Sequence, residues 1–196
     1  ALQPILDDIC DSKIIRMPKD HHIEGGDVML ADDYIFIGTY RGDDYPDLIT
    51  ARTNQKAIEA IKRHFSDKKI KSFNLRKSND DPYNNALHLD CCFQPVGENL
   101  AIIHKNGFLE EEEYNWLIDF YGKSNIFEIT KEEMYEMTSN IFSISPQVVL
   151  SDQHFKRLNQ WLESKNIKVE KINYREIAKQ EGLLRCSTLP LIRNSI

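Results

Sequence analysis

A cysteine near the C-terminal end of the chain is surrounded by residues that could make it a nucleophile. Cys186 follows Arg185 and precedes Ser187 and Thr188, within the stretch 181–191. A neighbouring cation lowers the pKa of a thiol, and nearby donors solvate the thiolate, which is the reactive form. The alternative is a buried, unreactive cysteine in a final strand, because unpaired cysteines are among the most buried residues. A catalytic role for Cys186 therefore requires a base and a carboxylate elsewhere in the chain.

The segment 86–93 offers both groups. Its apolar residues predict a strand, and side chains two positions apart on a strand point the same way, so His88 and Asp90 should share a face. An imidazole can act as a general acid and base, and a carboxylate can hold a cationic substrate. The alternative is a buried His–Asp pair with a purely structural role.

Two further acids flank a pair of glycines near the start of the chain. Glu24 and Asp27 enclose Gly25 and Gly26, where the backbone can bend sharply or approach a ligand closely. An ordinary turn with solvated acids is the alternative. The other histidines have no spacing typical of metal ligands, and the four cysteines include no CxxC pair. We therefore expect no zinc site.

The composition excludes several classes of protein. The chain has 196 residues, of which 41% are hydrophobic and 29% are charged, as is typical of a soluble globular domain. A net charge of −6 argues against a nucleic-acid surface, which needs a basic face. No apolar run approaches the roughly 18 residues of a membrane helix. We expect a cytoplasmic protein with reduced cysteines and with neither a nucleic-acid nor a membrane partner.

A hairpin, a helix and a strand recur in the same order along the chain. The recurrences cover about 24–75, 86–130 and 140–173, and a fourth begins in the tail at 182–193. Repetition at this scale is typical of radial arrays such as propellers. The first strands of such units meet near a shared axis, so their residues can come together despite their separation in sequence. The residues expected there are Glu24, His88, Asn140 and Cys186. We interpret residues 1–196 as a single catalytic domain.

Five short segments occur in the order of a known enzyme superfamily. They are Glu24-Gly25-Gly26-Asp27-Val28, Ile35-Phe36-Ile37-Gly38, Arg52-Thr53-Asn54, His88-Leu89-Asp90 and the tail 185–191. With these segments the chain resembles the guanidino-group-modifying enzymes, which include arginine deiminase, dimethylarginine dimethylaminohydrolase and the amidinotransferases. The resemblance covers nearly the whole chain, and in the tail it is strongest to arginine deiminase.

The resemblance implies an α/β propeller, the pentein fold, in which five ββαβ modules surround a pseudo-fivefold axis. Three complete units and a tail fall short of five, so we expect the first module to be missing from this chain. The resemblance also places an additional guanidinium-binding aspartate upstream of the Glu-Gly-Gly-Asp segment. We expect that aspartate to belong to the missing module.

The resemblance further implies that Cys186 attacks the central carbon of a guanidino group and forms a covalent thiouronium intermediate. His88 would protonate the leaving amine and then activate water, and Glu24 would orient His88 or hold the guanidinium. Thiolate, imidazole and carboxylates cover every step, so no metal or organic cofactor is expected. The residues expected to bind the substrate are Asp90, Asp27, Arg185 and Asn140.

Three functions are compatible with this pattern. The first is a deiminase-like hydrolase of arginine or an arginine derivative. The second is an amidinotransferase, which shares the catalytic residues but uses an acceptor amine in place of water. The third is a non-catalytic member of the fold that only binds a ligand. The third function is disfavoured by the joint presence of four residues, Cys186, His88, Asp90 and Glu24. The first two require a small guanidino molecule as the partner.

Overall fold

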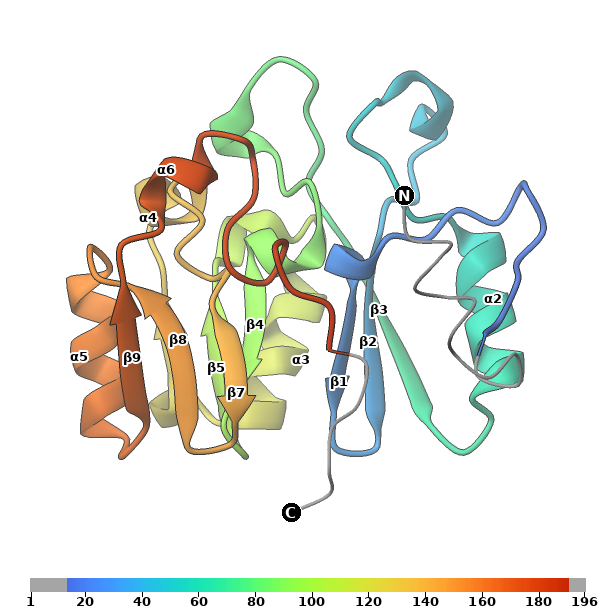
Figure 1. Cartoon of the computed structure of the whole chain (residues 1–196). Helices are drawn as coiled ribbons and strands as arrows, with labels where there is room; N and C mark the ends of the chain where they lie inside the picture. The colour runs from blue at the N-terminus through green and yellow to red at the C-terminus, as the bar shows by residue number, and fades with distance from the viewer. Residues whose placement is uncertain (1–13, 191–196) are drawn as a thin grey trace.

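Three small sheets lie side by side in the computed structural model, which describes residues 14–190 (Figure 1). Each sheet has an antiparallel pair of strands and a third strand that lies parallel to the second. A helix connects the second strand to the third in each case, because a parallel connection must return from one end of the sheet to the other. The chain therefore contains three successive ββαβ units, as the recurring pattern in the sequence predicted.

Local signals in the sequence set the hairpin and the helix of the first unit. Its elements are β1 (Val28–Ala31), β2 (Tyr34–Thr39), α2 (Gln55–His64) and β3 (Lys69–Asn74). Asp32 has a φ of 50° in the turn between β1 and β2, a conformation that Asp tolerates better than most residues. Asn54 caps α2, because its Oδ1 accepts a hydrogen bond of 3.1 Å from the amide of Ala57.

The second and third units repeat this plan. The second unit consists of β4 (Phe93–Val96), β5 (Leu100–Ile103), α3 (Glu111–Tyr121) and β6 (Ile126–Glu128). The third unit consists of β7 (Phe142–Ser145), β8 (Val148–Asp152), α5 (Lys156–Ser164) and β9 (Lys168–Ile172). Two short helices, α4 (Lys131–Tyr135) and α6 (Arg175–Ala178), follow β6 and β9. Across residues 14–190, no helix combines the length and the apolar character needed to cross a membrane.

Two buried clusters of apolar side chains join neighbouring units. One cluster includes Phe36 and joins the first unit to the second, and the other includes Ile102 and joins the second unit to the third. The residues just after His88 contribute to both, since Cys92 belongs to the first of these clusters and Cys91 to the other. The segment that carries His88 is therefore anchored in two cores at once.

The predicted strand over residues 86–93 was wrong. The segment contains a 3₁₀ turn at Leu89–Cys91, and β4 begins only at Phe93. The amide of Leu89 donates to the buried carboxylate of Asp27 at 2.9 Å rather than to a neighbouring strand. The Leu89 amide, which would bond to a neighbouring strand in a sheet, is thus bonded to a side chain instead.

The tail also differs from the sequence-based expectation. Residues 184–187 form a turn instead of a strand, and backbone amides of the tail bind the side chain of Asn140. The end of the predicted fourth unit, 191–193, lies outside the described residues.

The α/β class is confirmed, but the described part of the chain stops short of the complete predicted architecture. Residues 14–190 form three sheets and no closed ring of five. The five-module propeller, the missing first module and the single catalytic domain over residues 1–196 stay predictions.

The packing of Phe36 predicts a large loss of stability on its truncation. Its ring is fully buried and lies 5.6 to 5.7 Å, between centroids, from Phe73, Phe93 and Phe120. We expect Phe36→Ala to lower the free energy of unfolding by about 3–5 kcal/mol, because a cavity replaces the ring. The control is Leu30→Ala, since Leu30 is 72% exposed. Urea unfolding followed by circular dichroism measures both, and equal losses would contradict this description of the core.

Candidate active site

Side chains from three separate parts of the chain line one cavity of about 350 Å³. They come from the 3₁₀ turn Gly25–Asp27 and the residue before it, from the segment before β4, and from the tail. Five of the seven predicted site residues line this cavity, namely Glu24, His88, Asp90, Arg185 and Cys186. The other two, Asp27 and Asn140, hold backbone amides behind the cavity wall. The structure thus brings the predicted residues together, while their catalytic roles stay predictions.

The tail that carries Cys186 is held by the side chain of Asn140. The Oδ1 of Asn140 accepts hydrogen bonds from the amides of Leu183 at 3.2 Å, Arg185 at 3.0 Å and Cys186 at 3.3 Å. Its Nδ2 donates to the Sγ of Cys186 at 3.2 Å. Asn140 is fully buried, so water does not compete for these bonds. The contacts of Asn140 favour positioning of the thiol over the predicted contact with substrate.

Close packing beneath Cys186 requires a glycine at position 182. A Cβ on Gly182 would lie 2.9 Å from the Cβ of Cys186, which is too short for two carbon atoms in a packed interior. The preceding residue, Glu181, has a φ of 61° and lies in the left-handed region. The backbone therefore turns sharply just before the cysteine.

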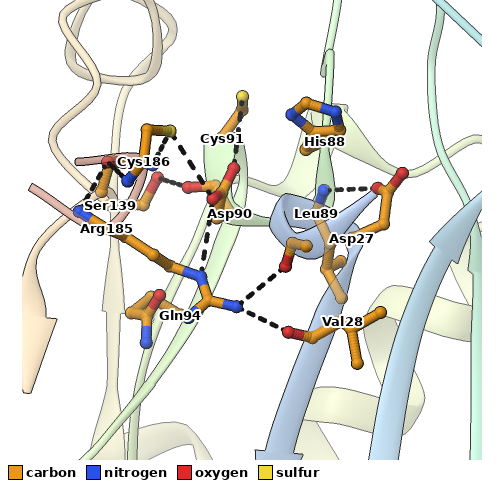
Figure 2. A network of polar contacts seen from close by, with 12 residues as sticks. Asp27, Val28, His88, Leu89, Asp90, Cys91, Gln94, Ser139, Arg185 and Cys186 are labelled. Carbon is orange, nitrogen blue, oxygen red and sulfur yellow. Dashed lines mark hydrogen bonds and ion pairs between the residues drawn. The ribbon is translucent and has the colours of Figure 1, made fainter. Parts of the chain in front are cut away.

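The carboxyl group of Asp90 lies at the centre of the polar network (Figure 2). Its Oδ2 is 3.9 Å from the Sγ of Cys186 and 3.5 Å from the Nε of Arg185. Its Oδ1 is 3.8 Å from the Sγ of Cys91. Burial raises the pKa of Asp90 to about 6, although the charge of Arg185 acts in the opposite direction. A buried carboxyl group that gains its charge near neutral pH is suited to hold a cation.

The thiol of Cys186 responds to the same surroundings. Burial and the neighbouring Asp90 raise the pKa of Cys186 above its ordinary value, while Asn140 and Arg185 oppose the rise. The thiol is therefore protonated at neutral pH when the site holds no cation. A cationic ligand on Asp90 would add positive charge beside the sulfur and favour the thiolate.

His88 and Glu24 form the second polar pair of the cavity. The Nε2 of His88 is 2.6 Å from Oε2 of Glu24, and the Oε1 of Glu24 is 3.2 Å from Nη1 of Arg52. Burial acts to raise the pKa of Glu24, but the hydrogen bonds from His88 and Arg52 outweigh it and hold the pKa below the ordinary value. An ionised carboxylate at Nε2 fixes the orientation of the imidazole. In the view of Figure 2, His88 and Cys186 lie on opposite sides of Asp90.

Gly26 and Asp27 support His88 from the first unit. A Cβ on Gly26 would lie 2.8 Å from the ring of His88, so only glycine allows the ring to approach the backbone this closely. The carboxylate of Asp27 is fully buried and accepts hydrogen bonds from the Leu89 amide at 2.9 Å and the Thr53 hydroxyl at 2.6 Å. Burial raises the pKa of Asp27. Both of its oxygens are occupied, so its contacts do not support the predicted substrate-binding role.

The guanidinium of Arg185 ties the tail to the first unit. Its Nη2 donates to the carbonyl oxygens of Gly25 at 3.2 Å and Val28 at 2.5 Å, as Figure 2 shows. Its Nε faces Asp90 but forms no hydrogen bond. Arg185 thus acts as a cross-link whose charge is near Asp90, and its predicted contact with substrate stays a prediction.

Two residues near the site were not assigned a role from the sequence. Arg52 belongs to one of the five recognised segments and lines a second, larger cavity of about 610 Å³ next to its partner Glu24. Lys77 places its ammonium group on two backbone carbonyls just before His88. Lys77 gave no signal in the sequence, because a lysine in the polar stretch 76–81 is normally solvated.

The thiols and acids that the structure describes do not form a metal site. Within residues 14–190, no group of three or more His, Cys, Asp or Glu side chains is arranged to hold a metal ion. Cys91, Cys92 and Cys186 are free thiols in the part of the chain that the structure describes.

The fold and the site together define the class of protein. Successive ββαβ units whose cysteine, histidine and carboxylates meet in one cavity place the chain in the guanidino-group-modifying pentein superfamily. Within that class, the chain belongs to the family described as "N,N dimethylarginine dimethylhydrolase, eukaryotic", whose profile matches residues 6–193. The resemblance inferred from the sequence is confirmed.

Several known proteins are similar to the chain in sequence. The uncharacterized protein YkgA of Bacillus subtilis is 29% identical over 174 residues, which cover 89% of this chain and 54% of that protein. The arginine deiminase of Borrelia recurrentis is 26% identical over 209 residues, which cover 91% of this chain and 48% of the deiminase. The chain thus spans about half the length of the curated relatives it matches.

Solved structures share the fold. The product-bound N-terminal domain of ArgZ, an arginine dihydrolase from the ornithine-ammonia cycle in cyanobacteria, matches with a TM-score of 0.70 and 19% identity, over 88% of this chain and 57% of that one. The DDAH of Pseudomonas aeruginosa, in complex with citrulline, matches with a TM-score of 0.69 and 20% identity, over 93% of this chain and 61% of that one.

The surroundings of Cys186 predict slow alkylation at neutral pH. Because the pKa of Cys186 is raised, labelling by iodoacetamide should accelerate with pH through a midpoint above that of an ordinary cysteine thiol. Asp90→Asn removes the neighbouring negative charge and should lower that midpoint. Peptide mass spectrometry measures the labelling from about pH 6 to about pH 10, with the buried Cys92 as an internal control. The same midpoint in both proteins would contradict this account of the charges.

Proposed function

We propose that this chain carries the active site of a cysteine-dependent hydrolase that acts on the guanidino carbon of arginine or an arginine derivative. The observation that carries the proposal is that the Cys186 thiol, the Asp90 carboxyl group and the His88–Glu24 pair line one cavity. These groups are a nucleophile, an anion that can hold a cationic substrate and a proton carrier with an oriented ring. Nucleophilic attack on a guanidinium requires all three.

Asp90 is the proposed anchor for the substrate. A guanidinium presents its N–H donors in a planar fork, and a carboxylate accepts two of them in parallel. The Sγ of Cys186 is 3.9 Å from the Oδ2 of Asp90, so a guanidinium bound to Asp90 has its central carbon beside the sulfur. Asp90 is only 1% exposed, and the attraction between opposite charges is stronger there than in water.

The first half of the reaction replaces a C–N bond by a C–S bond. The bound cation favours the thiolate of Cys186, which forms as the thiol releases its proton to water. The electron pair of the sulfur then attacks the central carbon and gives a tetrahedral adduct. His88 donates a proton to the departing nitrogen as the C–N bond breaks. Ammonia or an amine leaves, and the substrate remains attached to Cys186 as a thiouronium.

The second half of the reaction uses water. His88, now neutral, accepts a proton from a water molecule that attacks the same carbon. The C–S bond then breaks, and the product leaves with a urea-type group. Glu24 stays on the Nε2 of His88 at 2.6 Å and holds the ring in place through both proton transfers.

The relatives support this class of reaction. Arginine deiminases from several bacteria match 89–91% of this chain, and a variant of the ArgZ N-terminal domain has been solved with a covalently bound reaction intermediate. These observations concern those proteins. We extend them to this chain because its own cavity contains a cysteine, a histidine and carboxylates.

Product analysis distinguishes hydrolysis from amidino transfer. The native protein that contains this chain should convert arginine or a methylated arginine to citrulline without an added amine. Turnover that occurs only with an acceptor amine would indicate a transferase. Failure to convert arginine, agmatine and methylated arginines under either condition would overturn the proposal.

Substitution of the nucleophile should abolish turnover. We expect Cys186→Ser to lower kcat by more than about 10³-fold, because a serine hydroxyl group stays protonated beside the bound cation and is a far weaker nucleophile than a thiolate. His88→Ala should slow resolution, so that a thiouronium adduct accumulates on Cys186. Citrulline assays and intact-protein mass spectrometry measure these effects. Lys62→Met is the control, since Lys62 lies on the exposed face of α2 and outside the cavity, and its loss should leave kcat close to wild type.

The titration of Asp90 predicts the pH dependence of substrate binding. The pKa of Asp90 is raised to about 6, so the carboxyl group loses its charge as the pH falls through that value. We expect the Kd of arginine for the inactive Cys186→Ser variant to rise about tenfold for each pH unit below that value. Isothermal titration calorimetry measures the Kd. An Asp90→Asn/Cys186→Ser variant should bind weakly at every pH, and a flat profile in the parent variant would exclude Asp90 as the anchor.

A further inference from the structure

We propose that Lys77 and Asp27, one partly and one fully buried, form a clamp of opposite charges that sets the position of His88. Lys77 is then a positioning residue for the reaction proposed above, on which this inference rests. The clamp holds the backbone on both sides of His88, with the cation before it and the anion after it.

Lys77 holds the backbone immediately before His88. Its Nζ donates hydrogen bonds to the carbonyl oxygens of Ala86 at 2.8 Å and Leu87 at 2.7 Å. The amide of Ala86 also donates to the carbonyl oxygen of Arg76 at 2.9 Å. Residues 76 and 77, just after β3, are thus joined by three hydrogen bonds to residues 86 and 87, just before His88. The ammonium group of Lys77 donates two of the three.

Asp27 holds the backbone immediately after His88. Its Oδ1 accepts the hydrogen bond of 2.9 Å from the amide of Leu89, which Figure 2 shows beside the His88 ring. Its Oδ2 accepts the bond from the hydroxyl group of Thr53 at 2.6 Å. The backbone from Ala86 to Leu89 is therefore gripped at two carbonyl oxygens by a cation and at one amide by an anion.

Each charge of the clamp stabilises the other. Burial lowers the pKa of Lys77 and raises that of Asp27, and in each case the opposite charge of the partner opposes the change. A buried ion that loses its partner is costly, whereas removal of both charges together is often tolerated. The effects of substitutions at the two positions should therefore depend on one another.

The clamp acts through His88 rather than on the substrate. Neither Lys77 nor Asp27 lines the cavity that contains Cys186. His88 has little freedom to compensate for a moved backbone, because its ring packs on Gly26 and its Nε2 is bonded to Glu24 at 2.6 Å. A shift of the backbone on either side displaces the ring, and displacements of about 1 Å can cost about 10²-fold in rate.

Substitution of Lys77 tests the clamp in the native protein that contains this chain. We expect Lys77→Met to lower kcat by about 10- to 100-fold, with little change in KM and an unchanged alkylation rate of Cys186. Lys77→Arg keeps a positive charge with several donors and should recover most of the lost kcat. Lys62→Met is the matched control, since Lys62 lies on the exposed face of α2 with Glu59 as its partner, and it should behave as wild type.

The double variant Lys77→Met/Asp27→Asn makes the test decisive. It should lose no more kcat than the worse of the two single variants, because both act on the same backbone. A wild-type kcat in Lys77→Met, or fully additive losses in the double variant, would overturn the proposal. If Lys77→Met does not fold, a wild-type kcat in the double variant overturns the proposal and a lowered kcat supports it.

A separate measurement distinguishes failure of the clamp from failure of the proposed reaction. Hydrogen exchange at the Leu89 amide reports on the clamp without any substrate. It should be slow in wild type and in Lys62→Met, and faster in Lys77→Met. Slow exchange at Leu89 in Lys77→Met would overturn the clamp even if the protein hydrolyses arginine. Absence of turnover in wild type, with exchange as expected, would overturn the reaction alone.

Discussion

The side chain of Asn140 is the contact on which the arrangement of the site depends. Residues 182–190 pair with no strand, and one buried amide oxygen takes the place of such a partner by binding the amides of Leu183, Arg185 and Cys186. Asn140 lies just before β7, so this contact fixes the tail to the third unit, whereas Arg185 fixes it to carbonyl oxygens of the first unit. The position of the thiol is therefore set by how those two units sit against each other.

The charges around the cavity are paired, with one incomplete pairing at its centre. Glu24 lies between His88 and Arg52, and Asp27 is bonded to Thr53 and Leu89. The only cation beside Asp90 in residues 14–190 is Arg185, whose Nε lies 3.5 Å away without forming a hydrogen bond. The carboxyl group also has long contacts with the Sγ atoms of Cys91 and Cys186. A buried anion with an imperfect partner gains most from an incoming cation. The same cation also favours the thiolate of Cys186. Binding of a cationic substrate and activation of the nucleophile therefore depend on the same electrostatic interaction.

The parts of the fold that follow from local patterns could be predicted from the sequence. The recurring hairpin, helix and strand predicted the three ββαβ units, and the third predicted unit, 140–173, ends one residue after β9. The two predicted strands that proved to be turns depend on side chains that are distant in sequence. Asp27 is 62 residues from Leu89, and Asn140 is 45 residues from Arg185. The sequence of a segment does not show which distant side chain will accept hydrogen bonds from its backbone. The supporting roles of Asp27 and Asn140 were therefore found only in the structure, and so was that of Lys77.

The position of Asp90 next to Cys91 and Cys92 has a thermal consequence. These two cysteines belong to different buried clusters, so Asp90 lies at the boundary, or seam, between two separately packed interiors of the protein. Its pKa is raised by burial, and burial at a seam depends on how tightly both sides close. Warming that loosens either interior admits water to the carboxyl group and moves its pKa back toward the ordinary value. The pH range in which the site holds a cation therefore widens toward acid when either interior loosens.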